Sequence, residues 1–339
     1  MRVWTALAAA TVVATGCYNF DSFSRCWDAS CHPGDMVVPE DAGGVLDASR
    51  VDLTPDASVE SPPSCARLSR TCGASRDRSC CESLLVPAGA FLRSDDSDFP
   101  AAVGDFRLDR YEVTVGRFRK LIEAGGPGTQ VAPPPGGSGA GVMPGTGWDP
   151  AWNGQLSMNP ATIRAALRCD AKYETWTDAP GANESRPINC VDWYEAFAFC
   201  IWDGGRLPTE AEWNYAAAGG NDQRPYPWST TPSDVTIDPS YAVYNGAPLA
   251  VVGSKSPKGD GRWGHSDLAG NVWGWVLDWY GAYPKPCVDC ANVAPAQVRV
   301  LRGGSFGSSA SVLLTMMRPN APPSHRDNSS GFRCARNAR

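Results

Sequence analysis

The chain has 339 residues and 42% hydrophobic residues, enough for one large domain or two smaller ones with a proper core. Its 35 glycines and 29 prolines, with only 19% charged residues, indicate a loop-rich globular protein and exclude a helical bundle or a coiled coil. The formal net charge of −6 is local, because residues 35–64 hold seven acidic residues and one arginine, and the rest of the chain is formally neutral. A neutral domain lacks the basic surface that a phosphate backbone requires, so we expect no nucleic-acid partner.

The N-terminus has the pattern of a bacterial lipoprotein signal. A basic start precedes a twelve-residue apolar run, Val3 to Ala14, which is too short to cross a bilayer as a helix. The run ends in Ala14-Thr15-Gly16-Cys17, which resembles a lipobox, so we predict a lipoprotein signal peptide over residues 1–16 and lipid attachment at Cys17. The alternative is an ordinary signal peptide followed by a structural cysteine. Lipid attachment would make the membrane a partner and place the protein in the bacterial cell envelope, on the periplasmic or outer surface, with the outer membrane favoured.

The next segments are expected to be a tether and a cysteine-rich segment. Residues 17–64 are rich in Asp, Ala, Ser and Pro without periodicity, which predicts a flexible acidic tether. A cysteine-rich segment, 65–83, then leads into one main folded domain, 84–339. Thirteen cysteines indicate an oxidising compartment, and without Cys17 they are even in number. Cys287-x-x-Cys290 is half of a zinc-site spacing with no second pair, so we expect disulfides rather than a metal.

Short elements with clear boundaries follow along the predicted domain. A strand begins at Phe106, and Thr114 can cap a helix over 115–124 that Gly125 ends. A second helix is expected after Asp192, and residues 298–302 alternate as a strand.

A third helix is expected over 210–218, with a capping box of Thr209 and Glu212. Eight tryptophans lie between residues 193 and 279, and they are interpreted as core packing, with an aromatic ligand groove as the alternative. The pattern as a whole indicates a mixed α/β, loop-rich fold of modest regular content.

Five motifs occur in order along this domain. They are Phe106 to Thr114 (FRLDRYEVT), Gly205 to Trp213 (GRLPTEAEW), Asp267 to Trp273 (DLAGNVW), Arg302 to Phe306 (RGGSF) and Gly331 to Cys334 (GFRC). Together they resemble the formylglycine-generating enzyme, or sulfatase-modifying factor, family over about residues 84–336. The resemblance implies an α/β (α+β), loop-rich variant of the C-type lectin fold with a single main domain. It also implies a disulfide between Cys200 and Cys334.

The residues at the family's catalytic positions do not match its chemistry. Members of the family oxidise a cysteine of a sulfatase to formylglycine with two cysteines that bind copper(I). Counting from Gly303-Gly304-Ser305 places that pair at Ser308 and Leu313, and the sequence has no cysteine between Cys290 and Cys334. Copper(I) prefers thiolates, whereas a serine hydroxyl is a poor ligand and leucine is none. We therefore expect no copper and no catalytic residues of the family type.

Two further sites follow from the resemblance. A calcium loop of the family corresponds to Asp267 with the carbonyls of Gly270 and Val272, but its closing glutamate is Gly274 here. Because calcium takes six to eight oxygen ligands, this is a weak calcium candidate and no other cofactor is expected.

The second implied site is a ligand-binding border. Ser308, Arg318, His325 and Arg326 lie in the segment that borders the family's substrate groove, and they are candidate ligand-binding residues. Ordinary surface charge is the simpler account of the three basic side chains.

Three functions are compatible with these residues. The favoured one is a lipid-anchored, non-catalytic module of the cell envelope that binds a protein, a peptide or a glycan. The alternative is a formylglycine-generating oxidase-family enzyme that acts on protein cysteine through chemistry not readable from the sequence. A structural component of an envelope assembly is the third.

Overall fold

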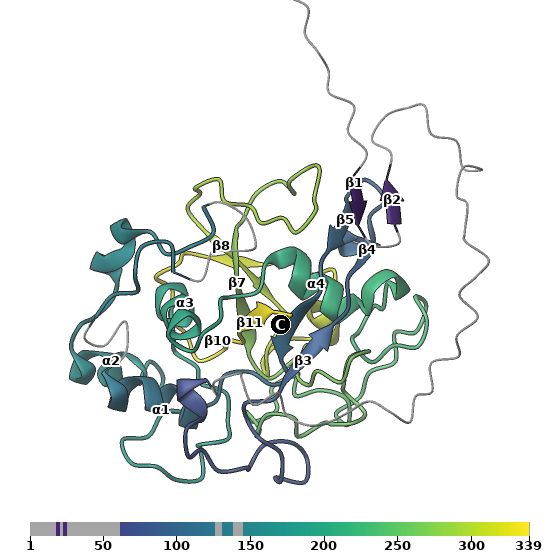
Figure 1. Cartoon of the computed structure of the whole chain (residues 1–339). Helices are drawn as coiled ribbons and strands as arrows, with labels where there is room; N and C mark the ends of the chain where they lie inside the picture. Colours follow the sequence, from purple (N-terminus) through teal and green to yellow (C-terminus); the bar gives the residue numbers. More distant parts are fainter. Residues whose placement is uncertain (1–17, 21–22, 26–61, 126–130, 138–144, 339) are drawn as a thin grey trace, which may run out of the picture. The chain divides into compact units, whose positions relative to one another are not determined.

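The computed structural model describes residues 18–20, 23–25, 62–125, 131–137 and 145–338 (Figure 1). The predicted signal peptide, Cys17 and most of the predicted tether lie outside the described residues. The chain divides into two compact units, Met1–Ser58 and Val59–Arg339. In the first unit, strands β1 (Tyr18–Phe20) and β2 (Phe23–Arg25) pair antiparallel within the segment predicted to be a tether. No helix among the described residues is both long and apolar enough to span a membrane.

In the second unit, the described residues form three small sheets joined by long loops. The largest has the strand order β10-β7-β8-β9, with β10 parallel to β7 and the other neighbours antiparallel. An antiparallel sheet of order β11-β6-β3 and a hairpin of β4 and β5 complete the set. The strands are β3 (Ser83–Val86), β4 (Gly89–Leu92), β5 (Pro100–Val103), β6 (Phe106–Asp109), β7 (Trp273–Trp279), β8 (Arg299–Arg302), β9 (Asn320–Ala321), β10 (Ser330–Phe332) and β11 (Ala335–Asn337).

The described residues form four α-helices around these strands, and in Figure 1 α1, α2 and α3 lie together on one side of β7 and β8. They are α1 (Val115–Ala124), α2 (Pro160–Ala166), α3 (Trp193–Trp202) and α4 (Glu210–Ala218). Short 3₁₀ helices occupy the connections at Pro63–Cys65, Arg93–Asp95, Pro150–Gln155, Gly220–Asp222 and Ala310–Leu313. Helices α3 and α4 both contact β7.

The predicted helix boundaries are confirmed because each depends on local capping. The Thr114 side chain accepts the Arg117 N–H at the start of α1, and Gly125 ends the helix in a left-handed conformation. Thr209 and Glu212 form the predicted capping box of α4. At α3, Asp192 caps the helix as expected, but Glu195 pairs with Arg326 instead of closing a capping box.

The core contains most of the aromatic side chains. One cluster brings α1 and α3 together with β7, and it includes Phe118, Trp193, Phe197 and Trp275. None of the eight tryptophans between residues 193 and 279 is exposed, so their interpretation as packing is confirmed. This mixed α/β, loop-rich domain agrees with the predicted fold class.

All ten cysteines in the described residues form disulfides. The pairs are Cys65–Cys81, Cys72–Cys80, Cys169–Cys190, Cys200–Cys334 and Cys287–Cys290. The Cys200–Cys334 bridge is the one that the resemblance implied, and Cys287–Cys290 is a disulfide rather than half of a zinc site.

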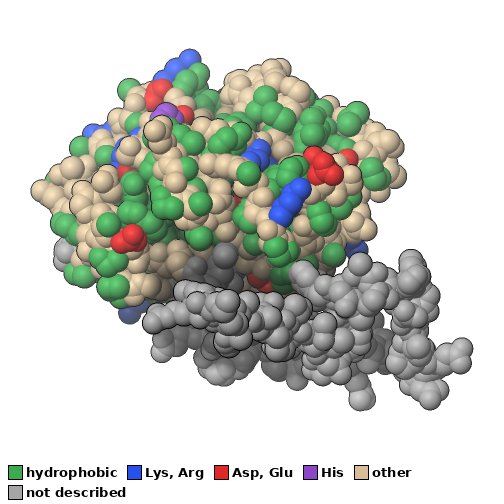
Figure 2. Space-filling model, turned by 90° about the horizontal axis from the view of Figure 1, so that it is seen from above, with side chains coloured by type: hydrophobic (Ala, Val, Ile, Leu, Met, Phe, Trp, Pro, Cys, Tyr) green, Lys and Arg blue, Asp and Glu red, His purple; other side chains and the backbone are tan. Residues whose placement is uncertain are grey.

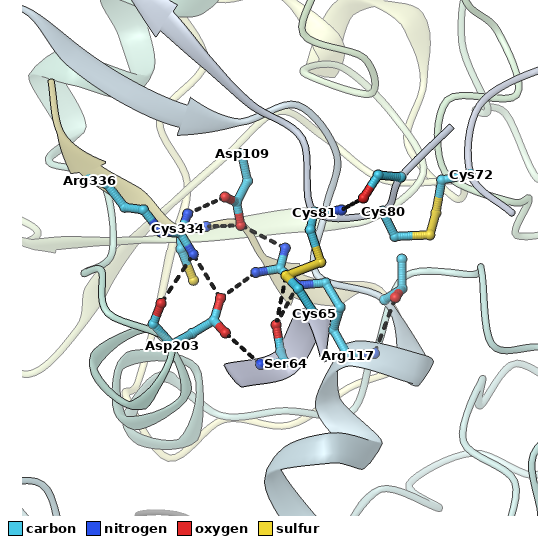
Figure 3. The surroundings of a disulfide bond; sticks show 12 residues. Ser64, Cys65, Cys72, Cys80, Cys81, Asp109, Arg117, Asp203, Cys334 and Arg336 are labelled. Carbon is cyan, nitrogen blue, oxygen red and sulfur yellow. Dashed lines mark hydrogen bonds and ion pairs between the residues drawn. A yellow bond between two sulfur atoms is a disulfide. The ribbon is translucent and has the colours of Figure 1, made fainter. Parts of the chain in front are cut away.

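The cysteine-rich segment is fixed to the domain by a buried set of charges that we call the inner network: Asp109, Arg117, Asp203 and Arg336 (Figure 3). The Arg117 guanidinium lies 2.8 Å from Asp109 and 2.5 Å from Asp203, and Arg336 bridges the same two carboxylates. Burial alone would raise the pKa of Asp109, but the two guanidiniums outweigh it and hold that pKa below its usual value.

Ser64 joins this network and corrects the predicted tether boundary. Its N–H donates to Asp203 at 3.0 Å, and its Oγ accepts from Arg117 at 2.9 Å. The composition of residues 17–64, which lacks periodicity, predicts that Ser64 belongs to the tether, yet Ser64 is fully buried. Composition does not reveal a hydrogen bond to residues that are 53 and 139 positions away.

Candidate functional site

The positions that correspond to the family's cysteine pair lie in a loop after β8. Ser308 is part of a turn: its Oγ accepts the Ser305 N–H at 3.0 Å, and its carbonyl accepts the Asn245 N–H at 2.8 Å. Leu313 is only 1% exposed, and it packs in a cluster with Tyr226 and Trp228. The region is therefore closed by packing where the family has a reactive pair.

Two further observations describe this packing. The rings of Tyr226 and Trp228 stack with centroids 5.1 Å apart, and Tyr241 continues the stack at 5.3 Å. A Cβ at Gly304 would lie 2.7 Å from Leu313 Cδ1, so the Gly-Gly motif lets the backbone approach this leucine closely. No free thiol lies near, because every cysteine of the described residues is in a disulfide.

Arg318, a predicted ligand-binding residue, forms an ion pair within the protein. Its guanidinium binds both carboxylate oxygens of Glu210, at 2.5 and 2.7 Å, and Arg302 reaches the same carboxylate at 3.0 Å. The N–H of Glu210 donates to Asp278, and burial together with the nearby Glu210 charge raises the pKa of Asp278 to about 7. Arg318 therefore anchors the loop after Leu313 to the start of α4.

Arg326 is likewise an internal ion-pair partner. It contacts Asp192 at 2.7 Å and also both carboxylate oxygens of Glu195, so it ties the last loop to the first turn of α3. His325 is exposed, with its Nε2 2.9 Å from Asp327. The interpretation of Arg318 and Arg326 as free surface charge is wrong, since both satisfy buried carboxylates of other elements. The structure gives Ser308, Arg318, His325 and Arg326 different neighbours and does not gather them around one cavity.

The residues of the calcium candidate do not fit a calcium ion. Asp267 and Val272 line a cavity of only about 10 Å³, enough for about one water molecule, and Arg302 and Arg333 line it too. The Asp267 carboxylate already accepts the Gly253 N–H at 2.5 Å, and burial raises its pKa to about 6. Gly270 is tied by its N–H to the Gly303 carbonyl.

The described residues hold no cluster of three or more His, Cys, Asp or Glu side chains that could bind a metal. The two carboxylates that line this cavity, Glu112 and Asp267, already accept hydrogen bonds from the chain, and the arginines beside them make the surroundings unfavourable for a divalent cation.

Sequence reasoning missed a buried acid beside this position. Glu112 accepts hydrogen bonds from Asn271 Nδ2 at 2.7 Å and from the Val272 N–H at 3.1 Å. Burial, with the Asp267 charge adding to it, raises the pKa of Glu112 well above its usual value. The only sequence signal was its place in the first motif, between Tyr111 and Val113.

One face of the molecule is shown in Figure 2. Hydrophobic and neutral polar side chains cover most of it, and basic side chains are few and scattered.

Comparisons with known proteins place this chain. The family model described as "Sulfatase-modifying factor enzyme 1-like domain" matches residues 69–338. The formylglycine-generating enzyme of Thermomonospora curvata is 30% identical over 303 residues, which cover 74% of this chain and 92% of that protein. A protein named inactive C-alpha-formylglycine-generating enzyme 2, from Bos taurus, is 34% identical over 168 residues, covering 45% of this chain and 50% of that protein.

A solved structure agrees at the level of the fold. PvdO from Pseudomonas aeruginosa superposes with a TM-score of 0.52 and 22% identity, covering 82% of this chain and all of that chain. Its likeness, with the mixed α/β architecture described above, shows a fold like that of the formylglycine-generating enzymes. The chain therefore belongs to the sulfatase-modifying factor enzyme 1-like family, which includes the formylglycine-generating enzymes.

Proposed function

We propose that this protein is a non-catalytic member of its family, held at the bacterial cell envelope by a lipid on Cys17, and that its domain binds a segment of another protein. The observation that carries the proposal is the replacement of the reactive pair by Ser308 in a turn and Leu313 in an aromatic cluster. Copper(I) chemistry needs thiolates, and all the described cysteines are committed to disulfides.

A protein ligand is supported by apolar side chains that stay exposed next to this loop. Met316 is 49% exposed and Met317 is 37% exposed, and both follow directly after the buried Leu313 and its neighbours. Tyr280, also exposed, lies under the Arg318 guanidinium at 4.8 Å. Methionine adapts its shape to a partner, and exposed apolar groups beside polar ones are typical of protein interfaces.

Because the family includes formylglycine-generating oxidases, oxidation of a protein cysteine is the competing function. One assay distinguishes this activity from a non-catalytic role. Purified full-length protein with copper is incubated with a cysteine-containing sulfatase peptide, and aldehyde is measured by mass spectrometry against a formylglycine-generating enzyme as positive control. We expect no aldehyde. Formylglycine that depends on this chain would overturn the non-catalytic proposal.

Binding is tested by placing a photo-crosslinker at Met316 in intact cells. The matched control is Val235, which is 62% exposed and does not follow the Leu313 loop. We expect a defined protein adduct from position 316 and none from position 235. Equal labelling at both positions, or none at either, would contradict a protein-binding face at Met316.

The anchor is tested separately, with labelled fatty acid. Incorporation into the wild-type chain that disappears in Cys17→Ala is the expected result. A soluble, unlabelled product would remove the lipid anchor from the proposal but leave the binding face.

A further inference from the structure

The walls of a second cavity include no residue of the loop of Ser308 and Leu313. This cavity has a volume of about 350 Å³, and we call it the three-segment cavity because its walls come from three separated stretches: Gly73–Arg76, Ala182–Arg186 and Ala250–Ser254. That volume lies at the lower end of the range for small-ligand sites, and it suits a group no larger than one sugar or one amino-acid residue.

Hydrogen bonds between residues far apart in the sequence join the three walls. The Gly73 N–H donates to the Val252 carbonyl at 3.0 Å, and the Val252 N–H donates to the Ser185 carbonyl at 3.0 Å. The hydroxyls of Thr71 and Ser185 lie 2.5 Å apart. The disulfide Cys72–Cys80 further holds the first wall, and both of its cysteines are buried with Tyr111 and Val252. The cavity is therefore built before any ligand arrives.

Two arginines, Arg76 and Arg186, line this cavity, and their guanidiniums have no partner among the described residues. Arg76 and Arg186 make no side-chain hydrogen bond, ion pair or ring contact with any residue that the structure describes. The nearby Glu184 is already paired with Arg119 at 2.7 Å. Arginines elsewhere in the domain, such as Arg117, Arg318 and Arg326, are each paired with carboxylates. The two cationic side chains at the cavity thus retain their full capacity to bind an anion.

A third polar group at the cavity, the Ser254 hydroxyl, also favours an anionic ligand. Ser254 lines the cavity, and its buried Oγ has no hydrogen-bond partner among the described residues. A buried hydroxyl without a partner is costly, and an anionic oxygen that accepts from it would remove that cost.

We propose that the three-segment cavity binds a compact oxyanion, namely a phosphate or sulfate group, free or as the ester of a small carrier. Arg76 and Arg186 supply the charge and the forked donors, and Ser254 supplies a neutral donor. The small side chains of Gly73, Ala74, Ala182 and Ala250 leave room for the carrier. This cavity shares no residue with the proposed protein-binding face at Met316 and Met317.

The test measures melting temperature and calorimetric binding of the full-length protein with sodium phosphate or sodium sulfate against sodium chloride at equal ionic strength. We expect a saturable rise in melting temperature with the oxyanions only. Arg76→Ala and Arg186→Ala should each weaken binding at least about tenfold, and Ser254→Ala a few-fold.

The matched control is Arg164→Ala, which removes the same charge from an exposed position on α2, outside the cavity. It should bind the oxyanions as wild type does. A comparison of inorganic phosphate with O-phosphoserine and glucose 6-phosphate distinguishes a free ion from an ester, since only an ester-binding cavity gains affinity from the carrier. Equal responses to chloride and oxyanions, or equal loss in Arg164→Ala and Arg186→Ala, would overturn the proposal. Melting of each variant without ligand shows whether it is folded.

Discussion

The arginines of the inner network and of the three-segment cavity differ in whether a carboxylate pairs with the guanidinium. In the inner network, Arg117 is completely buried and pairs with Asp109 and Asp203, and Ser64, next to Cys65, bonds to this network (Figure 3). At the cavity, Arg186 is half-buried and no carboxylate of the described residues lies within ion-pair distance. An arginine that is paired with buried carboxylates stabilises the fold. An arginine that lacks such a partner and lies beside a cavity is instead available to bind a ligand.

The largest expected effect comes from the covalent link next to the inner network. Replacing Cys200 and Cys334 with serine opens a loop with a sequence separation of 134, and loop-closure entropy predicts a loss of about 5 kcal/mol in the free energy of unfolding. The control is the serine pair at Cys287 and Cys290, whose separation of 3 predicts about 2 kcal/mol. Denaturant unfolding checks both. Equal losses would show that loop length does not set the contribution of these bridges.

The second prediction contrasts the two arginines directly. Arg117→Met leaves Asp109 and Asp203 with Arg336 as their remaining cationic partner, and an undercompensated buried charge costs about 3–5 kcal/mol. Arg186→Ala breaks no pair and should change the free energy of unfolding by less than about 0.5 kcal/mol. Urea unfolding of both variants measures this contrast. A large loss in Arg186→Ala would mean that the cavity arginine serves the fold after all.

A third prediction concerns a buried group that should stay neutral beside the inner network. Burial, helped by the positive charge of Arg333, lowers the pKa of His265 to about 3 from a usual 6.5. The unfolded chain therefore binds a proton between these values while the folded protein does not, so His265 contributes stability above pH 6.5 that is lost as the pH falls. At pH 5 the loss is about 2 kcal/mol relative to pH 8.

The variant His265→Gln should lack this part of the pH dependence. The measurement is the difference in the free energy of unfolding between wild type and variant across pH 5–8, which cancels the titration of the other groups. A difference that does not change with pH would show that His265 is not held neutral in the fold.

The smallest expected effect is that of calcium. Asp267 lines the small cavity of about 10 Å³ together with Arg302 and Arg333, and its carboxylate accepts the Gly253 N–H. Adding millimolar calcium, or removing it with a chelator, should therefore shift the melting temperature by less than about 1 °C, within the scatter expected for a surface effect. A saturable rise with calcium that Asp267→Asn abolishes would restore the metal site that the family resemblance implied.

The sequence determined much of this protein by itself. Helix boundaries at Thr114, Thr209 and Gly125 could be predicted because a cap is a contact between residues only a few positions apart. The motifs gave the family, and the absence of cysteine at Ser308 and Leu313 needed only counting along the chain.

Tertiary structure alone decided what the charged residues do. Arg318 and Arg326 look like groove residues in the sequence, but their carboxylate partners are 108 and 131 positions away. The three-segment cavity likewise joins three stretches that lie far apart in the sequence, and no local pattern marks Arg76 and Arg186 as neighbours of one space. The pairing of charges depends on which elements the folded core brings together. Only the fold could therefore show which arginines pair with carboxylates and which remain available to bind a ligand.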